Sequence, residues 1–188
     1  MDRRLVVLSY PKLSQKDYDW IQRVRAVHDM YHGLVEPHIT FVFPSRMDES
    51  TFVKHVKQLA SGMKEFGIVA RCALTVKDTY GRYSQVFLIP DEGFSSIVRI
   101  HDRLYTGILA PELRLDIPFY PHIGIGNSTD VHECKRLADE LNSTNFEIEG
   151  IVDALDIAEL QSERVPTGTA GEENQARAVN TIEQIALA

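Results

Sequence analysis

Two histidines sit in nearly identical short segments of this chain. His38 lies in Pro-His-Ile-Thr-Phe, and His122 lies in Pro-His-Ile-Gly-Ile, 84 positions later in a sequence of 188 residues. In an extended strand, residues i and i+2 share a face, so each imidazole points to the same side as Thr40 or Gly124. Proline suits the first residue of a strand, where no ladder donor is needed. We therefore expect two strands that each present a histidine at their start.

A pair of imidazoles can carry out acid–base chemistry on a phosphodiester. With an unperturbed pKa of about 6.5, one ring can accept a proton while the other donates one. Hydrolysis of a cyclic phosphodiester needs both acts, a base for the attacking water and an acid for the departing alkoxide. A hydroxyl such as that of Thr40 can donate to the non-bridging oxygens as charge develops. This chemistry requires no metal and no cofactor.

The elements that position these histidines follow from local patterns. Strands are expected over residues 4–10, 38–43, 68–77, 85–89, 121–126, 146–152 and 154–160, and helices over residues 14–27, 48–63, 95–109 and 129–142. Residues 161–178, whose centre at 165–174 is rich in Gly, Thr and Glu, are expected to form a mobile loop. Residues 178–187 suit either a strand or a helix, and we favour a strand.

This order of elements predicts an α+β fold. The second part of the chain repeats the alternation of strands and helices found in the first. The two Pro-His-Ile segments lie about half a chain apart, as an internal duplication would give. No linker is long enough to separate independent domains. Residues 1–188 are therefore expected to form one unit of two similar lobes that share a core, with the histidines facing each other across a cleft.

Composition bounds the class of protein. The chain has 44% hydrophobic and 25% charged residues, which excludes disorder and coiled coil. A net charge of −7 argues against extended coating of nucleic acid, although one phosphate can bind in a locally polarised cleft. The apolar stretch at residues 5–8 is too short for a signal peptide. Cys72 and Cys134 lie in no metal-binding or redox motif, so we expect both to be reduced thiols. We expect a cytoplasmic monomer with no membrane contact.

Further residues are candidates for binding a substrate. Tyr10 and Lys12 follow the first strand and could stack a base or attract a phosphate, although we favour surface packing for both. Arg82, in the turn at residues 80–83, could steer an anionic ligand or be an ordinary exposed hairpin residue. Tyr120 is the better candidate, because the adjoining Pro121 and its histidine fix its position near the cleft.

The remaining histidines are expected to be structural. The pair at residues 28 and 32 lacks a carboxylate or thiol at ligand spacing, so no metal site is predicted. His55, His101 and His132 fall in predicted helices among charged residues, where a solvated face is expected.

The two motifs together resemble those of the 2H phosphoesterases, which include bacterial RNA 2′,3′-cyclic phosphodiesterases. The family carries two H-x-[T/S]-x motifs on facing strands. Residues 38–41 match the motif fully, residues 122–125 match at the histidine and both apolar positions, and the stretches 101–105 and 119–122 also look like bacterial members. The resemblance covers nearly the whole chain. It implies a bilobal fold with two antiparallel sheets lining a central cleft and helices outside.

The same resemblance implies a function. It predicts that His38 and His122 act as acid and base in hydrolysing a 2′,3′-cyclic phosphate on a nucleotide or an RNA end, with RNA end-joining as the reverse reaction. Gly124 departs from the family, which has Thr or Ser there. A lost donor of this kind costs about 2.7–4 kcal/mol, roughly a hundredfold or more in rate. Tyr120, Asn127 or Ser128 could donate instead. The alternative is a catalytically weak module that binds a nucleotide or a protein partner.

Overall fold

A computed structural model of the chain describes residues 4–77, 83–164 and 175–188. Within them, β1 (Arg4–Ser9), β3 (Ile39–Ser45), β8 (Ala154–Arg164) and β9 (Gln175–Ala186) form one sheet, and β2 (Lys12–Leu13), β4 (Phe66–Lys77), β5 (Ser84–Glu92), β6 (Ile123–Ser128) and β7 (Ile148–Val152) form another. The strand orders are β3-β1-β8-β9 and β2-β7-β4-β5-β6, and every recorded pairing is antiparallel. The predicted α+β class with two antiparallel sheets is confirmed.

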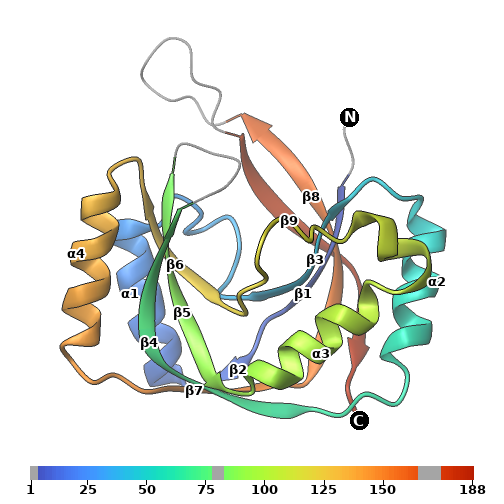
Figure 1. Cartoon of the computed structure of the whole chain (residues 1–188), viewed down its shortest axis with the longest axis horizontal. Coiled ribbons are helices and arrows are strands. Elements are labelled where there is room, and N and C mark those ends of the chain that lie inside the picture. Colours follow the sequence, from blue (N-terminus) through green and yellow to red (C-terminus); the bar gives the residue numbers. More distant parts are fainter. Residues whose placement is uncertain (1–3, 78–82, 165–174) are drawn as a thin grey trace.

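Two pairs of helices flank these sheets. They are α1 (Gln15–His28) with α4 (Val131–Asn142), and α2 (Glu49–Ala60) with α3 (Phe94–Leu104). The first pair packs on β4, β5 and β6 and the second on β3, β5 and β9, so the pairs lie at opposite ends of the molecule with the sheets between them (Figure 1). Side chains of Ser14, Asp48 and Asp130 cap three of the helices. No helix of the described residues combines the length and apolar content needed to span a membrane.

The core is a continuous apolar cluster with members from both sheets and all four helices, among them Val7, Ile21, Phe41, Phe52, Val86, Ile97, Ile125 and Leu137. A smaller cluster of Val6, Leu8 and Ala158 lies on the opposite face of the β1–β8 pair. Because Thr40 pairs directly with Leu8, its side chain shares that second face. Thr40 is therefore half-buried on the face turned away from the main core.

The two sheets do not correspond to the two halves of the sequence. Late strands β8 and β9 join the early strands β1 and β3, whereas β4 and β5 pair with the later β6 and β7. The two halves of the sequence therefore interleave in the two sheets. As a result, β3 and β6, the strands that follow the two histidines, each lie at the edge of a different sheet.

The helix predicted over residues 95–109 and the loop predicted over residues 161–178 have other bounds in the structure. The helix expected over residues 95–109 ends at Leu104, because Thr106 is extended and Gly107 has φ 56°, after which a 3₁₀ helix covers Gly107–Glu112. In the expected loop at residues 161–178, the first and last four residues belong to β8 and β9, whose register extends to the pair Arg164–Gln175. Residues 165–174 lie outside the described residues. The favoured strand at residues 178–187 is confirmed within β9.

The outer edge of β3 is covered by side chains of α3 and its cap. The Nδ1 of His101 lies 2.9 Å from the carbonyl oxygen of Phe41, and the Phe43 N–H donates to the Tyr105 hydroxyl at 3.0 Å. His101 is 3% exposed and stacks on Phe119, with ring centroids 3.7 Å apart. The prediction that His101 lies on a solvated face is therefore wrong. Its ring instead hydrogen-bonds a backbone carbonyl at the strand edge, which no neighbouring strand binds. Likewise, His55 is half-buried, with Nε2 3.0 Å from the carbonyl oxygen of Leu104.

The Tyr105 hydroxyl can be removed without disturbing its ring. Tyr105→Phe should lower the free energy of unfolding by about 1 kcal/mol, because the Phe43 N–H loses its acceptor. Hydrogen exchange should accelerate at the Phe43 amide and not at amides of β1. Unchanged exchange at Phe43 would show that this contact does not hold the edge.

Candidate active site

His38 directly precedes β3, and the backbone of its own segment holds its ring. Its Nδ1 lies 2.8 Å from the carbonyl oxygen of Glu36. A carbonyl oxygen can only accept, so Nδ1 must carry the proton and the neutral ring keeps Nε2 as its acceptor. The ring of Tyr10 meets that of His38 edge-on, with centroids 6.2 Å apart. The first motif therefore presents an Nε2 atom that can take up or release a proton.

His122 repeats this arrangement just before β6. Its Nδ1 lies 2.6 Å from the carbonyl oxygen of Tyr120, again two residues earlier, so the same tautomer follows. The ring of Phe87 stacks on His122 with centroids 3.6 Å apart and an interplanar angle of 18°. Phe87 reaches it because β5 pairs with β6 and places Phe87 opposite Gly124. The second imidazole is thus fixed both by its backbone and by an aromatic ring.

Burial lowers the pKa of both histidines. For His122 the pKa falls to about 4, chiefly because burial disfavours the charged ring, and the charge of His38 lowers it further. For His38, burial is again the main cause of the lowered pKa, with the nearby Arg25 acting in the same direction. Both imidazoles are therefore neutral at pH 7. The charge of His38 contributes to the lowered pKa of His122, although the strands that follow the two rings belong to different sheets.

The residue two positions after each histidine differs between the motifs. Thr40 offers a hydroxyl on the same face of its sheet as Leu8, with which it pairs across the strands. At Gly124, an added Cβ would meet no atom within 4 Å, so the place of the missing hydroxyl is open space. The two residues of β6 that could have supplied a substitute hydrogen-bond donor are bound to other partners. The Asn127 amide donates to Asp29 at 2.8 Å, and the Ser128 hydroxyl donates to Glu133 at 2.5 Å.

Of the expected binding residues, Tyr10 places its side-chain ring against a motif histidine. It is half-buried, and burial together with the charge of Asp156 raises its pKa to about 12, so it remains a neutral phenol. Tyr120 is 41% exposed, and it contacts His122 through its backbone carbonyl oxygen. Lys12 instead pairs with Asp153 at 2.6 Å. Arg82 lies outside the described residues, so its proposed contact is not tested.

Sequence reasoning missed Phe87 and Asp156. Asp156 is 3% exposed and lies opposite Leu8 on the Thr40 face of the sheet, and it accepts a hydrogen bond from Gln184 at 3.0 Å. Burial raises the pKa of its carboxyl. Both residues reach the site through cross-strand pairing, for which the local sequence pattern carries no signal.

A surface hollow of about 1100 Å³ lies away from the histidines, between the start of α1 and β7. Its lining includes Lys12, Phe146 and Glu149 and neither motif histidine. In the described part of the chain, no group of three or more His, Cys, Asp or Glu side chains is placed to hold a metal ion. The chemistry-bearing groups found near the site are thus the imidazoles, the Thr40 hydroxyl and the side chains around them.

Comparison with known proteins gives the family. The family model of the 2′-5′ RNA ligase superfamily matches residues 12–164, and the chain belongs to this superfamily of 2H phosphoesterases. A relative from Geobacillus sp. (strain WCH70), named "Putative phosphoesterase", is 27% identical over 140 residues, covering 74% of this chain and 79% of its own. Family and fold together support a phosphoesterase- or ligase-like function.

Solved structures share the fold at low sequence identity. The protein TT0787 of Thermus thermophilus matches with a TM-score of 0.60 and 16% identity, covering 98% of this chain and 97% of that chain. E. coli LigT complexed with 3′-AMP matches with a TM-score of 0.55 and 14% identity, covering 100% and 99%. LigT has also been solved with NADP+, ATP and phosphate. The bilobal 2H fold expected from the motifs is confirmed.

The lowered pKa of His122 predicts how stability depends on pH. The unfolded chain binds a proton at His122 near pH 6.5 and the folded chain only near pH 4, so acidification through this window favours unfolding. At about 1.4 kcal/mol per pKa unit, this linkage is worth up to about 3 kcal/mol. Urea unfolding at pH 7 and pH 4 should show a larger loss for the parent than for His122→Gln, in which this titration is absent. Equal losses would contradict the shift.

Proposed function

We propose that this protein is a metal-independent phosphodiesterase that hydrolyses 2′,3′-cyclic phosphates of nucleotides or RNA ends. The observation that carries the proposal is that two histidines are held in the same way, each with Nδ1 bound to the carbonyl oxygen two residues earlier, and that the charge of His38 contributes to the lowered pKa of His122. Two Nε2 atoms are then available on either side of one phosphorus centre, one as base and one as acid. The family membership agrees with this chemistry, and LigT, which shares the fold, binds 3′-AMP.

In the reaction, one histidine takes a proton from the attacking water and the other gives a proton to the departing ribose oxygen. A water oxygen attacks phosphorus and gives its proton to the Nε2 of the neutral histidine. The bond from phosphorus to one ribose oxygen breaks, and the Nε2–H of the protonated histidine transfers its proton to that oxygen. The Thr40 hydroxyl donates to a non-bridging oxygen as negative charge builds up. The products are a phosphomonoester and a free ribose hydroxyl, and the pair ends with its proton on the other ring.

We assign the acid role to His38 and the base role to His122. When the two neutral rings take up one additional proton, it binds to the ring whose charged form is less penalised by its surroundings. Phe87 stacks flat on His122 and shields it from water, whereas Tyr10 meets His38 only edge-on. A phosphate anion between the rings raises both pKa values, because an opposite charge favours the imidazolium form. Substrate binding therefore supplies the protonated acid that the free protein lacks at pH 7.

A binding module without turnover is the second candidate, and Gly124 is the observation that favours it. One phosphate-directed hydroxyl is absent, and Asn127 and Ser128 are bonded elsewhere. Such a module would hold a nucleotide or protein partner at the same histidines. End-joining of RNA is the reverse of the proposed reaction and uses the same groups, but in dilute aqueous solution hydrolysis is favoured.

The pH dependence of kcat/KM reports the free protein and follows from the two lowered pKa values. Activity requires one protonated and one neutral histidine, so the bell-shaped profile should peak below pH 6.5, the ordinary pKa of an imidazole. The profile of kcat, which reports the complex, should peak at higher pH. Initial rates with 2′,3′-cyclic AMP across pH 4–8 provide the measurement. A kcat/KM maximum above pH 7 would contradict the assignment.

The open space at Gly124 allows a direct test of the missing hydroxyl. Gly124→Thr should raise kcat by about tenfold or more, since a single donor to the phosphoryl oxygens is worth about 10²–10³ when well placed. Gly124→Val has the same shape without the hydroxyl and should not raise kcat. His38→Ala and His122→Ala should each lose at least about a hundredfold.

The assay separates the two candidate functions. Rates are measured with a 2′,3′-cyclic mononucleotide and with EDTA present throughout, which should leave the parent rate unchanged. Nucleotide binding without turnover in the parent and in Gly124→Thr would favour the binding module. Strict dependence on a divalent ion would overturn the metal-independent mechanism.

A further inference from the structure

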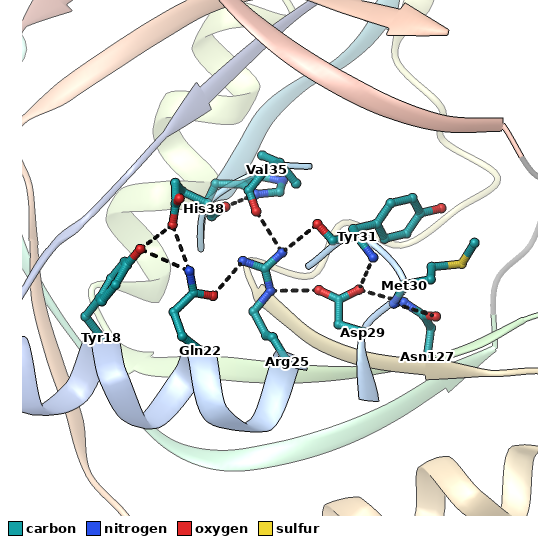
Figure 2. A network of polar contacts seen from close by, with 10 residues as sticks. Tyr18, Gln22, Arg25, Asp29, Met30, Tyr31, Val35, His38 and Asn127 are labelled. Carbon is teal, nitrogen blue, oxygen red and sulfur yellow. Dashed lines mark hydrogen bonds and ion pairs between the residues drawn. The ribbon is translucent and has the colours of Figure 1, made fainter. Parts of the chain in front are cut away.

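A buried arginine ties α1 to the segment that leads into His38. The Arg25 side chain is 2% exposed, and its Nε donates to Asp29 at 2.7 Å. Its Nη2 donates to the carbonyl oxygens of Val35 at 2.8 Å and Tyr31 at 3.3 Å (Figure 2). A buried guanidinium is tolerated only where its donors are satisfied, so these acceptors must stay in place. Arg25 therefore fixes the backbone three residues before His38.

The same helix holds the residue that orients the His38 ring. The Glu36 carboxylate accepts from the Tyr18 hydroxyl at 2.6 Å and from the Gln22 amide at 2.9 Å. Tyr18, Gln22 and Arg25 are spaced by four and three positions and share one face of α1. Because the Glu36 carbonyl oxygen accepts from His38 Nδ1, these contacts act on the tautomer and direction of the imidazole.

The network continues from Asp29 to the strand that follows His122. The Asn127 amide donates to Asp29 Oδ1 at 2.8 Å, and Asn127 Oδ1 accepts from the Met30 N–H at 3.4 Å (Figure 2). Asp29 also accepts from the Tyr31 N–H at 2.9 Å. Asn127 belongs to β6, which begins directly after His122. One chain of polar contacts thus joins the approach to His38 with the strand of His122.

We infer that Arg25, Asp29 and Asn127 form a positioning network that fixes the distance and orientation between the two motif imidazoles. The inference rests on the proposed function for its catalytic consequence, but the geometry of the histidine pair can be measured without turnover. The two histidines directly precede edge strands of different sheets, so the hydrogen bonds within a sheet do not set their separation. A cross-link between their flanking segments does.

Asn127→Ala is the informative change, because it cuts the bridge and leaves the buried Arg25–Asp29 pair intact. Removing either charged partner would leave an uncompensated buried charge and endanger folding. Asn142→Ala is the matched control. The Asn142 amide oxygen accepts from the Ala73 N–H at 2.7 Å, its NH₂ group donates to the Ala73 carbonyl oxygen at 2.9 Å, and neither contact leads to a motif histidine.

The first measurement is the electrostatic coupling between the rings. NMR titration of the histidine Cε1–H signals gives the pKa of His122 with and without His38→Gln, and the difference is the coupling, which depends on ring separation. The coupling should be smaller in the Asn127→Ala background than in the parent and unchanged in the Asn142→Ala background. Equal coupling in all three backgrounds, or an equal decrease in both asparagine variants, would overturn the inference.

The second measurement is steady-state hydrolysis of 2′,3′-cyclic AMP. Asn127→Ala should lower kcat by about 10- to 100-fold with little change in KM, because misplaced groups lose rate more than binding. Asn142→Ala should retain the parent kcat. Parent-like kcat in Asn127→Ala would overturn the positioning role even if the coupling falls. If the parent itself shows no turnover, the proposed function fails, and the coupling measurement alone decides on the network.

Discussion

The site depends on one repeated backbone interaction, the hydrogen bond from each histidine Nδ1–H to the carbonyl oxygen two residues earlier. In both motifs a buried proline, Pro37 or Pro121, stands between the carbonyl and the histidine. Its fixed φ restricts the approach to the strand, and its missing N–H makes no demand on the sheet edge. The interaction sets the tautomer, and the tautomer makes Nε2 the nitrogen that exchanges protons. Burial lowers the pKa of both rings and so keeps them neutral at pH 7.

The sequence predicts the features that depend on local chemistry. The two Pro-His-Ile segments, the common face of His38 and Thr40, and the capped helices all follow from composition and period, and the family resemblance extended them to a bilobal fold. The features that the sequence could not predict depend on contacts between distant segments. Phe87 stacks on His122 only because β5 pairs with β6, and a charged Arg25 on a helix is ordinarily solvent-exposed, so its burial has no local signal.

The interleaved topology explains why these long-range contacts are needed. Because β3 and β6 are edge strands of different sheets, each motif has one side without a neighbouring strand. His101 and Tyr105 complete the edge of β3, and Asn127 connects β6 to the turn after α1. Gly124 is the departure within this frame, and it removes a hydroxyl without disturbing the histidine pair. The proposed acid–base site therefore lacks, in its second motif, the hydroxyl that Thr40 offers in the first.

In the proposed mechanism, both imidazoles present Nε2 to a common phosphoryl group. Long-range ¹⁵N–¹H correlation spectra of the histidines at pH 7, recorded with and without 3′-AMP, test this most directly. We predict that His38 and His122 both carry their proton on Nδ1 in the free protein and that both Nε2 signals move when the nucleotide is added. A ring protonated on Nε2 in the free protein, or a response confined to one histidine, would contradict the mechanism.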